Sequence, residues 1–521
     1  MNVPAVDPGA SLNARRRATE LSDLSARGGR PVDVLVIGGG VTGAGVALDA
    51  AARGLTVVLA ERHDLAFGTS RWSSKLVHGG LRYLATGDLS VARESAVERG
   101  ILLERTAPHL VHPVPQLFPL HEGITRRAEA VIRAGCRAGD LLRRSAGTSA
   151  QLLPRSRRAG REETLQLAPG VRPDGLRGGV LLWEGRLTDD ARLVVCLART
   201  AARHGARILT RCAAEQITGR GAVLRDTLTG EQYGVDARTV VNAAGVWAGE
   251  VAPGIRLRPS RGSHLVLPAS CFAGQRAVLT VPVPHTSNRF VMAIPAPDGR
   301  VYVGLTDRDA PGPVPDVPEP TPDEVDFLLD TVNGVVQRPV GRGELCGTFA
   351  GLRPLLDSPG RSADISRRHA VITASDGLVT VVGGKLTTYR RMAEDALDAA
   401  LAAGGLDAAP CRTATLPLVG AAPRVTLARV AAPLRLVERY GVEAPAVLAE
   451  AAGDPALLEP LGGTPVTGAE LLFAVRHEGA LDASDLLDRR TRIGLDDADR
   501  DRVLPRAQEL VGEHARVMRE C

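Results

Sequence analysis

Cysteine is scarce in this 521-residue chain: there are seven, and no two of them form a CxxC pair. An odd, scattered set is typical of reduced thiols in a cytosolic protein. Its spacing matches neither a zinc site nor an iron–sulfur cluster, so no metal site is expected. At roughly 150 residues per domain, the length predicts two to four domains, which excludes a small scaffold held together by disulfides.

Long apolar runs are also missing. The best candidate, residues 34–52, is interrupted by glycines and Asp49, so no segment is expected to span a bilayer. The first 30 residues contain Arg15, Arg16 and Arg17 but no apolar core followed by a cleavage site. They are therefore expected to form a flexible tail on a cytoplasmic protein.

An excess of one charge is absent as well. The 64 Lys and Arg residues exceed the 59 Asp and Glu residues by only five. This mild positive charge gives no reason to expect nucleic acid as a partner. It is compatible with anionic substrates and with anionic lipid surfaces.

The apolar pattern predicts an α/β protein. A near-continuous apolar run, VDVLVIG from Val32, is typical of a parallel strand buried on both faces; a small-residue helix over 43–53 and a second strand over 56–60 follow. Alternating runs predict an antiparallel sheet, at 179–183, 239–241, 264–267, 289–294 and 301–304. From residue 420 onward the Ala- and Leu-rich sequence predicts a separate helical domain.

The strongest local motif is GGGVTG, which places Gly38, Gly40 and Gly43 between the first strand and the helix, with Glu61 at the end of the next strand. This is the dinucleotide-binding fingerprint in its required context. Gly38 permits a tight turn, Gly40 lets the backbone approach a pyrophosphate, and Gly43 lets the helix pack on the strand. The helix N-terminus offers N–H groups to phosphate, and Glu61 can accept hydrogen bonds from a ribose. The fingerprint alone does not distinguish FAD from NAD.

Five further motifs follow in order: GTSRWSSKLVHGGLRYL at 68–84, VVNAAGVWA at 240–248, GSHLV from Gly262, GLRPL from Gly351 and GGKLTTYR at 383–390. With these motifs the chain resembles the FAD-linked respiratory glycerol-3-phosphate dehydrogenases of the D-amino-acid-oxidase-like flavoprotein superfamily. The resemblance covers about residues 31–420, and ELLFAVRHEGA with LLDRRTRI extends it to Ile493. It implies a Rossmann-type FAD-binding domain interleaved with an antiparallel-sheet substrate domain over 31–419, and an all-helical C-terminal domain over 420–521.

The resemblance implies a non-covalent FAD site built largely from small residues. Serine hydroxyls and a lysine can hydrogen-bond a pyrophosphate or ribityl chain, and glycines let backbone approach a flat ring. Glycines before a helix place a positive backbone dipole where a reduced flavin carries charge. Without the resemblance, each segment has a purely structural alternative. The residues at 73–80 also fit a surface loop, Gly383 and Gly384 also fit an ordinary turn into a helix, and the residues at 242–245 also fit tight packing of a strand on a loop. The expected cofactor-binding residues are Gly38, Gly40, Gly43, Glu61, Ser73, Ser74, Lys75, His78, Gly79, Gly80, Ala244, Gly245, Gly383, Gly384, Lys385, Leu386 and Thr387.

The reaction implied is oxidation of sn-glycerol 3-phosphate to dihydroxyacetone phosphate by hydride transfer from C2 to flavin N5. A small dianion needs fixed cations, and guanidinium groups match phosphate oxygens bidentately. Outside a motif, an arginine in a chain with 64 basic residues is usually a solvated surface charge. The substrate-binding candidates within the motifs are Arg82, Tyr83, Arg353, Arg367 and Lys385.

Two histidines are candidates for taking the hydroxyl proton, because an imidazole titrates near working pH. His264 in GSHLV is the preferred base, and Arg353 is expected to stabilise the developing alkoxide. His78 in KLVHGG is the other candidate, with an ordinary structural role as its alternative. Trp72 stands where the family is expected to have a small or polar residue, and Leu305 where threonine is common. Both residues are expected to reshape the rim of the substrate pocket.

Residues 122–161 hold ten arginines among apolar positions, which predicts a basic amphipathic helix or a pair of helices. The resemblance implies that electrons pass to a membrane quinone. Such helices bind anionic bilayers at about 1 kcal/mol per basic residue near the surface. Peripheral contact with the cytoplasmic face of the membrane is therefore expected, with a solvated charged face as the alternative.

Three other functions stay open at this stage. The first is an oxidase of the same substrate that reduces O2 to peroxide. The second is a related flavin oxidase acting on an amine or another hydroxy acid. The third is a flavin-bearing sensor or interaction module with no catalytic role. The sequence also leaves open whether the chain forms a homodimer.

Overall fold

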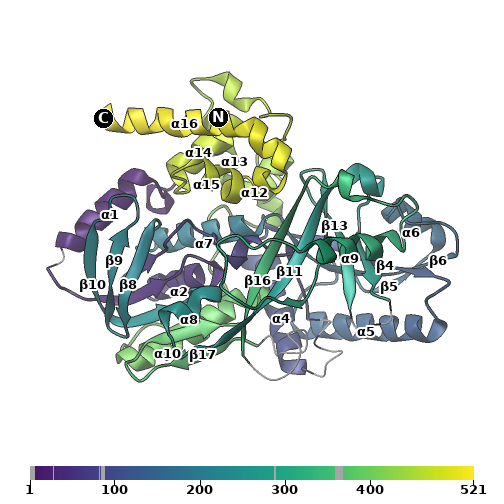
Figure 1. The fold of residues 1–521 in the computed structure, drawn as a ribbon, viewed down its shortest axis with the longest axis horizontal. Coiled ribbons are helices and arrows are strands. Elements are labelled where there is room, and N and C mark those ends of the chain that lie inside the picture. Colours follow the sequence, from purple (N-terminus) through teal and green to yellow (C-terminus); the bar gives the residue numbers. More distant parts are fainter. Residues whose placement is uncertain are drawn as a thin grey trace.

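The computed structural model describes residues 6–26, 28–80, 83, 88–284, 286, 289–357 and 368–520. Two β-sheets with helices packed around them form the body of the molecule, and the C-terminal helices gather on one side of it, at the top of Figure 1. The predicted α/β class, with an antiparallel sheet and a helical C-terminal domain, is confirmed.

The first sheet is mainly parallel and carries the dinucleotide-binding fingerprint. Its strands follow the order β17, β18, β10, β1, β2 and β7, and a β8–β9 hairpin continues from β10. Val34, Leu35 and Val36 of the central strand are completely buried, because helices cover one face of the sheet and the β8–β9 hairpin with the N-terminal helix covers the other. The bounds are β1 Val32–Ile37, β2 Val57–Ala60, β7 Arg207–Leu209, β8 Cys212–Thr218, β9 Gly221–Asp226, β10 Gln232–Asn242, β17 Ala370–Thr373 and β18 Val379–Val382.

The second sheet is largely antiparallel and contains four of the five strands predicted from alternation. The prediction was wrong for 239–241, which belongs to β10 and pairs in parallel with β1 of the first sheet. Its order is β15, β11, β14, β13, β12, β4, β6 and β3, with β16 beside β11 and β5 beside β6. Strands β4 and β12 form a parallel pair within it. The bounds are β3 Leu76–Val77, β4 Val111–His121, β5 Arg157–Ala159, β6 Leu176–Leu187, β11 Leu257–Pro268, β12 Val278–Pro282, β13 Phe290–Pro295, β14 Arg300–Gly304, β15 Arg308–Asp309 and β16 Gly347–Leu356.

Helices cover the two sheets and link them. The fingerprint helix begins at Val41, two residues earlier than the pattern predicted, because Gly40 serves as its N-cap. Helix α7 begins after Asp189, whose carboxylate accepts hydrogen bonds from the N–H groups of Ala191 and Arg192. The bounds are α1 Ala14–Ala26, α2 Val41–Ala52, α4 Leu89–Ile101, α5 Arg126–Ser145, α6 Arg161–Leu167, α7 Asp190–Arg203, α8 Ala248–Val251, α9 Pro322–Asn333 and α10 Tyr389–Gly404.

Two expectations need correction. The N-terminal segment was predicted to be a flexible tail, but residues 14–26 form helix α1, which buries Leu21 and Leu24 against the first sheet. Arg17 also pairs with Asp226 at 2.7 Å. The arginine-rich segment 122–161 contains the single helix α5 and the short strand β5, so the alternative of two helices there is wrong.

The C-terminal helices contact the rest of the chain through buried ion pairs. Their bounds are α11 Arg424–Leu427, α12 Leu434–Tyr440, α13 Ala444–Ala449, α14 Gly468–His477, α15 Ala483–Asp485 and α16 Asp497–Glu520. Arg489 and Arg490 lie 2.6 and 2.8 Å from Asp64, in the loop after β2. Arg192 of α7 pairs with Glu478. All of these side chains are nearly inaccessible to solvent, so removing one partner would leave an uncompensated buried charge.

Among the described residues, no helix combines the length and apolar character needed to cross a membrane.

Candidate active site

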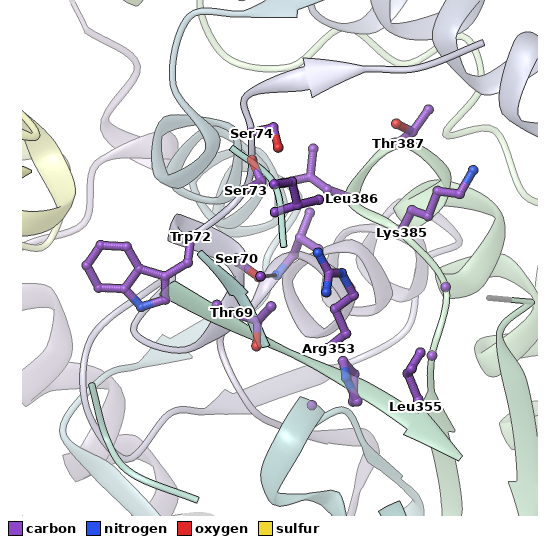
Figure 2. A pocket seen from close by; sticks show the side chains of 18 of the residues that line it. Thr69, Ser70, Trp72, Ser73, Ser74, Arg353, Leu355, Lys385, Leu386 and Thr387 are labelled. Atoms are coloured by element: carbon purple, nitrogen blue, oxygen red, sulfur yellow. Dashed lines mark hydrogen bonds between the residues drawn. The ribbon is translucent and has the colours of Figure 1, made fainter. Parts of the chain in front are cut away.

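A cavity of about 1390 Å³ is lined by residues from both sheets. One part is formed by the fingerprint turn, the end of β2 and the loop after β10. Another is formed by β16, the turn at 383–387 and the segment 68–80. A third is formed by strands β4, β12 and β13 together with helix α5. Figure 2 shows side chains from several of these segments around the cavity.

The fingerprint glycines leave no room for a side chain. A Cβ atom on Gly43 would lie 1.9 Å from the carbonyl oxygen of Gly38, and one on Gly38 would lie 2.7 Å from the carbonyl oxygen of Ala243. Gly38 also has a φ of +104°, which disfavours other residues. At the start of α2, the backbone N–H of Val41 donates to the Ser70 hydroxyl at 2.9 Å. Gly40, Val41 and Thr42 line the cavity, so the helix N-terminus opens on it, as a phosphate site requires.

Glu61 follows β2 and is held by two backbone donors. The N–H of Gly39 donates to its Oε2 at 2.6 Å, and the N–H of His63 donates to Oε1 at 2.7 Å. Burial raises the pKa of Glu61, and these two N–H groups oppose that rise. The carboxylate is thus fixed at the cavity wall, in the position predicted for a ribose-binding group.

Among the predicted residues Ser73, Ser74 and Lys75, the serines reach the cavity and the lysine does not. Ser73 and Ser74 line the cavity, and the Ser73 hydroxyl donates to Asp190 at 2.8 Å. Lys75 is 4% exposed, and its Nζ lies 3.4 Å from the same carboxylate. Burial lowers the pKa of Lys75. The lysine predicted to contact the cofactor therefore has its side chain directed into the protein interior.

His78 and Gly80 line the cavity, whereas Gly79 packs behind it. A Cβ atom on Gly79 would lie 2.1 Å from the guanidinium of Arg99. The N–H of Gly79 donates to Glu184 at 3.0 Å, and this carboxylate also pairs with Arg99. The glycine is therefore required by close packing against a buried ion pair.

The turn before α10 brings two predicted substrate groups together. Gly383 and Gly384 have φ values of +79° and +72°, which glycine adopts readily. Lys385 follows, with its Nζ 3.7 Å from the centre of the Tyr83 ring and 3.1 Å from the hydroxyl of Ser95. The ammonium group thus lies over the face of the phenol ring, and both residues line the cavity.

Arg353 of β16 also lines the cavity, and its guanidinium is held from behind. It donates to Asp307 at 2.9 Å, to the carbonyl oxygen of Thr306 at 3.2 Å and to the hydroxyl of Ser260 at 3.3 Å. Gly262 makes room for it, because a Cβ atom there would lie 2.3 Å from a guanidinium nitrogen. Figure 2 shows Arg353 among the side chains drawn around the cavity, with Lys385 on the neighbouring turn.

His264 lies behind the cavity wall. Its ring is 0% exposed, and its Nε2 is 2.8 Å from the hydroxyl of Ser74, which does line the cavity. Burial, together with Lys75 and Arg353, holds the pKa of His264 well below its usual value. The imidazole is therefore neutral at neutral pH, and Ser74 stands between it and the cavity.

The structure brings most of the predicted site residues to one cavity. Arg82 and Arg367 lie outside the described residues. Gly43, Lys75, Gly79 and His264 lie behind the wall. The predicted residues that line the cavity are Gly38, Gly40, Glu61, Ser73, Ser74, His78, Gly80, Tyr83, Ala244, Gly245, Arg353, Gly383, Gly384, Lys385, Leu386 and Thr387.

Sequence reasoning missed several residues that support the site. Ser70 accepts from the helix N-terminus, and Asp307 holds Arg353. Asp190, the first residue of α7, accepts from the Ser73 hydroxyl and pairs with Lys75. Ser70 lies inside a quoted motif and could have been found. The two aspartates are far from their partners in sequence, and no local pattern indicates them.

The residues present fit FAD. Gly38, Gly40 and Gly43 form a turn that side chains would fill, Glu61 is fixed by two backbone donors, and the wall continues to Gly383 and Gly384. This is the donor and acceptor set that a dinucleotide requires: N–H groups for phosphate, a carboxylate for ribose, and backbone without side chains beside a flat ring.

Comparison with known families matches residues 33–390 to the FAD dependent oxidoreductase family and residues 411–520 to the C-terminal domain of alpha-glycerophosphate oxidase. The chain is 55% identical over 510 residues to glycerol-3-phosphate dehydrogenase 1 of Mycobacterium tuberculosis, an alignment that covers 96% of this chain and 98% of that protein. It is 36% identical over 563 residues to the mitochondrial glycerol-3-phosphate dehydrogenase of Arabidopsis thaliana, covering 98% and 87%.

Solved structures resemble the fold as well. The glycerol-3-phosphate dehydrogenase of Bacillus halodurans, complexed with FAD, matches with a TM-score of 0.73 and 28% identity, covering 96% of this chain and 94% of that one. The L-alpha-glycerophosphate oxidase of Mycoplasma pneumoniae shares the fold with a TM-score of 0.56 at 19% identity, and covers 75% of this chain.

Proposed function

Because the chain belongs to the family of FAD-dependent glycerol-3-phosphate dehydrogenases, we propose that it oxidises sn-glycerol 3-phosphate to dihydroxyacetone phosphate and passes the electrons to a quinone. The observation that carries the proposal is the convergence of Arg353, Lys385 and Tyr83 on the cavity that also holds the dinucleotide fingerprint. Cationic groups suited to a phosphate and a turn suited to FAD therefore line the same cavity.

The cofactor would be held by the fingerprint turn, Glu61 and the turn at 383–387. FAD, when bound, supplies the acceptor for the hydride of the substrate. The chain's own contribution is to fix this group without side-chain movement, because the glycines are locked by close contacts and the Glu61 carboxylate by two N–H donors. Such preorganisation lowers the cost of positioning at the moment of reaction.

Arg353 and Lys385 would hold the phosphate dianion. The Arg353 guanidinium is preorganised by Asp307 and by the Thr306 carbonyl, so little side-chain freedom is lost when substrate binds. Lys385 adds a second positive charge, and Tyr83 beside it adds a hydroxyl donor. With the phosphate bound in this way, the secondary alcohol of the substrate would face the part of the cavity proposed to hold the flavin.

The hydroxyl proton has a route out through Ser74. The Ser74 hydroxyl lines the cavity and lies 2.8 Å from Nε2 of the neutral His264. When Ser74 takes the proton from the substrate hydroxyl, it passes its own proton to His264. This arrangement keeps His264 as the final base, acting through Ser74 instead of touching the substrate as the sequence led us to expect. Arg353 would stabilise the alkoxide as it develops.

Anaerobic mixing with substrate tests this function. The purified yellow protein should be bleached by sn-glycerol 3-phosphate, with one equivalent of dihydroxyacetone phosphate formed, while glycerol at the same concentration should bleach it far more slowly. A yellow colour that persists under these conditions would rule out the proposed reaction. Comparing peroxide yield with quinone reduction over many turnovers then distinguishes a dehydrogenase from an oxidase.

The third part of the cavity supports a quinone as acceptor. Helix α5 contributes Val131, Ile132 and Cys136 to the wall, opposite apolar residues that include Phe118 and Phe290. Val131 is 65% exposed, so this apolar wall continues to the surface. A quinone ring is flat and apolar, and such a passage suits it.

A bulky residue in this passage provides the test. Ile132→Trp should slow reduction of a soluble quinone analogue while leaving the rate of anaerobic bleaching by substrate unchanged. The matched control is Ile124→Trp, because Ile124 packs against the same cluster without lining the cavity. If Ile132→Trp slows neither half-reaction, or slows bleaching alone, the passage is not the acceptor's route.

Helix α5 also supports docking on an anionic membrane. It lies along one side of the molecule, at the lower right of Figure 1 and away from the C-terminal helices. Val131 and Leu141 are 65% and 68% exposed, and Arg133 and Arg137 are exposed on the same helix. Apolar side chains surrounded by arginines are typical of helices that lie in a bilayer surface.

Vesicle flotation tests the docking. The protein should float with vesicles containing phosphatidylglycerol but not with pure phosphatidylcholine vesicles, and salt should weaken the binding. The double charge reversal Arg133→Glu with Arg137→Glu should abolish it. Reversal of Arg429, an exposed arginine of the C-terminal domain, should leave it intact. Equal flotation of both variants would argue against a specific role for α5.

A further inference from the structure

Phe349 lies at the centre of an aromatic cluster that contacts the predicted base. It stacks on His264, with ring centres 4.5 Å apart and planes 11° apart, and on Trp72, with centres 5.8 Å apart. Tyr302 meets it edge-on at 5.8 Å. Because stacked rings resist rotation and sliding, Phe349 restricts the orientation of the imidazole.

The C-terminal domain supplies the other side of this cluster. Leu495, in the turn before α16, is 3% exposed and packs in one cluster with Phe349 and Tyr302. Arg492, three residues earlier, donates to the carbonyl oxygen of Arg71 at 2.6 Å, and its guanidinium lies 5.1 Å from the centre of the Trp72 ring. The turn therefore contacts both the aromatic cluster and the backbone of segment 68–80.

We propose that the C-terminal domain positions the base of the reaction: its turn at 492–495, acting through Trp72 and Phe349, holds the His264 ring in line with Ser74. Trp72, which departs from the family pattern, joins the turn to the stack. The inference rests on the proposed function, since it assigns a role to His264 in that reaction. In this account Leu495 and Arg492 are positioning residues that touch neither substrate nor cofactor.

The pKa of His264 depends on where its ring lies among three charged groups. Lys75 and Arg353 oppose protonation of the ring, whereas Asp190 favours it. These groups come from segment 68–80, from β16 and from α7, so a ring that moves changes its distance from each of them. If the cluster loosens, water reaches the ring and its pKa moves toward the ordinary value.

The test compares two leucine truncations in the same domain. Leu495→Ala opens space beside Phe349, whereas Leu510→Ala, equally buried at 3%, opens space in the separate core around α14 and α16. Both should lower the melting temperature. Only Leu495→Ala should lower the plateau rate of anaerobic bleaching several-fold and move its acid limb upward by about one pH unit. Leu495→Met, which conserves volume, should restore both values.

A second measurement does not depend on activity. In protein labelled with [13Cε1]histidine, the His264 signal is identified by its loss in His264→Asn. In the wild type its titration midpoint should lie well below that of an exposed histidine, and in Leu495→Ala the midpoint should move upward. Equal pH profiles and equal histidine titrations in the two alanine variants would overturn the positioning role. Failure of substrate to bleach the wild type would instead overturn the proposed function, so the two outcomes are distinguishable.

Discussion

Arg353 provides the most informative single substitution, because its removal should affect two groups: the substrate phosphate that it is proposed to bind and the Asp307 carboxylate that it now neutralises. In Arg353→Ala the phosphate loses a guanidinium, and each charged hydrogen bond is worth about 1.5–3 kcal/mol. The Asp307 carboxylate, now paired at 2.9 Å with Arg353, would also lose that neutralising charge, which adds about 1 kcal/mol of repulsion toward a dianion.

Together these effects amount to about 4 kcal/mol, so kcat/KM for sn-glycerol 3-phosphate should fall about a thousandfold. Bound FAD should be retained, because Arg353 is not among the residues proposed to hold it. Steady-state rates with glycerol, which has no phosphate, should fall much less, because only the stabilisation of the developing alkoxide is lost. Adding Asp307→Asn to Arg353→Ala should recover about fivefold by removing the carboxylate charge. A loss of less than about threefold, or an equal loss with glycerol, would refute the assignment of Arg353 to the phosphate.

Three further outcomes follow from the same geometry. Glu61→Ala should weaken FAD binding about ten- to a hundredfold, measured by fluorescence titration of the apoprotein, because a charged acceptor for ribose is lost. Ser74→Ala should lower the bleaching rate about a hundredfold with little change in the substrate concentration at half-maximal rate, because the proton relay is broken. Burial lowers the pKa of His109 to about 3, so between pH 7 and pH 5.5 the unfolded state binds more protons than the folded state, and stability falls as the pH falls. Urea denaturation should show His109→Gln losing about 1 kcal/mol less than wild type across this range.

The sequence predicted those elements whose defining residues are neighbours in the chain. The fingerprint turn follows from Gly38 and Gly43, whose missing side chains can be read directly from the sequence. A Cβ atom on Gly43 would meet Gly38 of the same turn, whereas the close contact of Gly38 with Ala243, after β10, is not visible in the local pattern. Helix α5 is equally local, since its periodicity needs no partner. Helix α1 could also have been predicted, because Asn13 caps it by accepting from the N–H of Arg16, and Leu21 and Leu24 form its apolar face.

Long-range contacts explain what the sequence did not predict. Lys75 turns inward because Asp190, on a different helix, offers a buried carboxylate. His264 lies behind Ser74 because β11 and β16 pair in a register that places it beside Phe349. Neither partner is visible in the local sequence, since each contact forms only when two sheets and a helix have assembled.

The central claim is that this cavity removes the hydrogen on C2 of a bound three-carbon phosphate ester. The most direct measurement is stopped-flow bleaching, without oxygen, by sn-glycerol 3-phosphate carrying either hydrogen or deuterium at C2. The account predicts that the deuterated substrate bleaches the protein several-fold more slowly while the final extent of bleaching is the same. Identical rates under conditions where the chemical step limits bleaching, or no bleaching with either substrate, would contradict it.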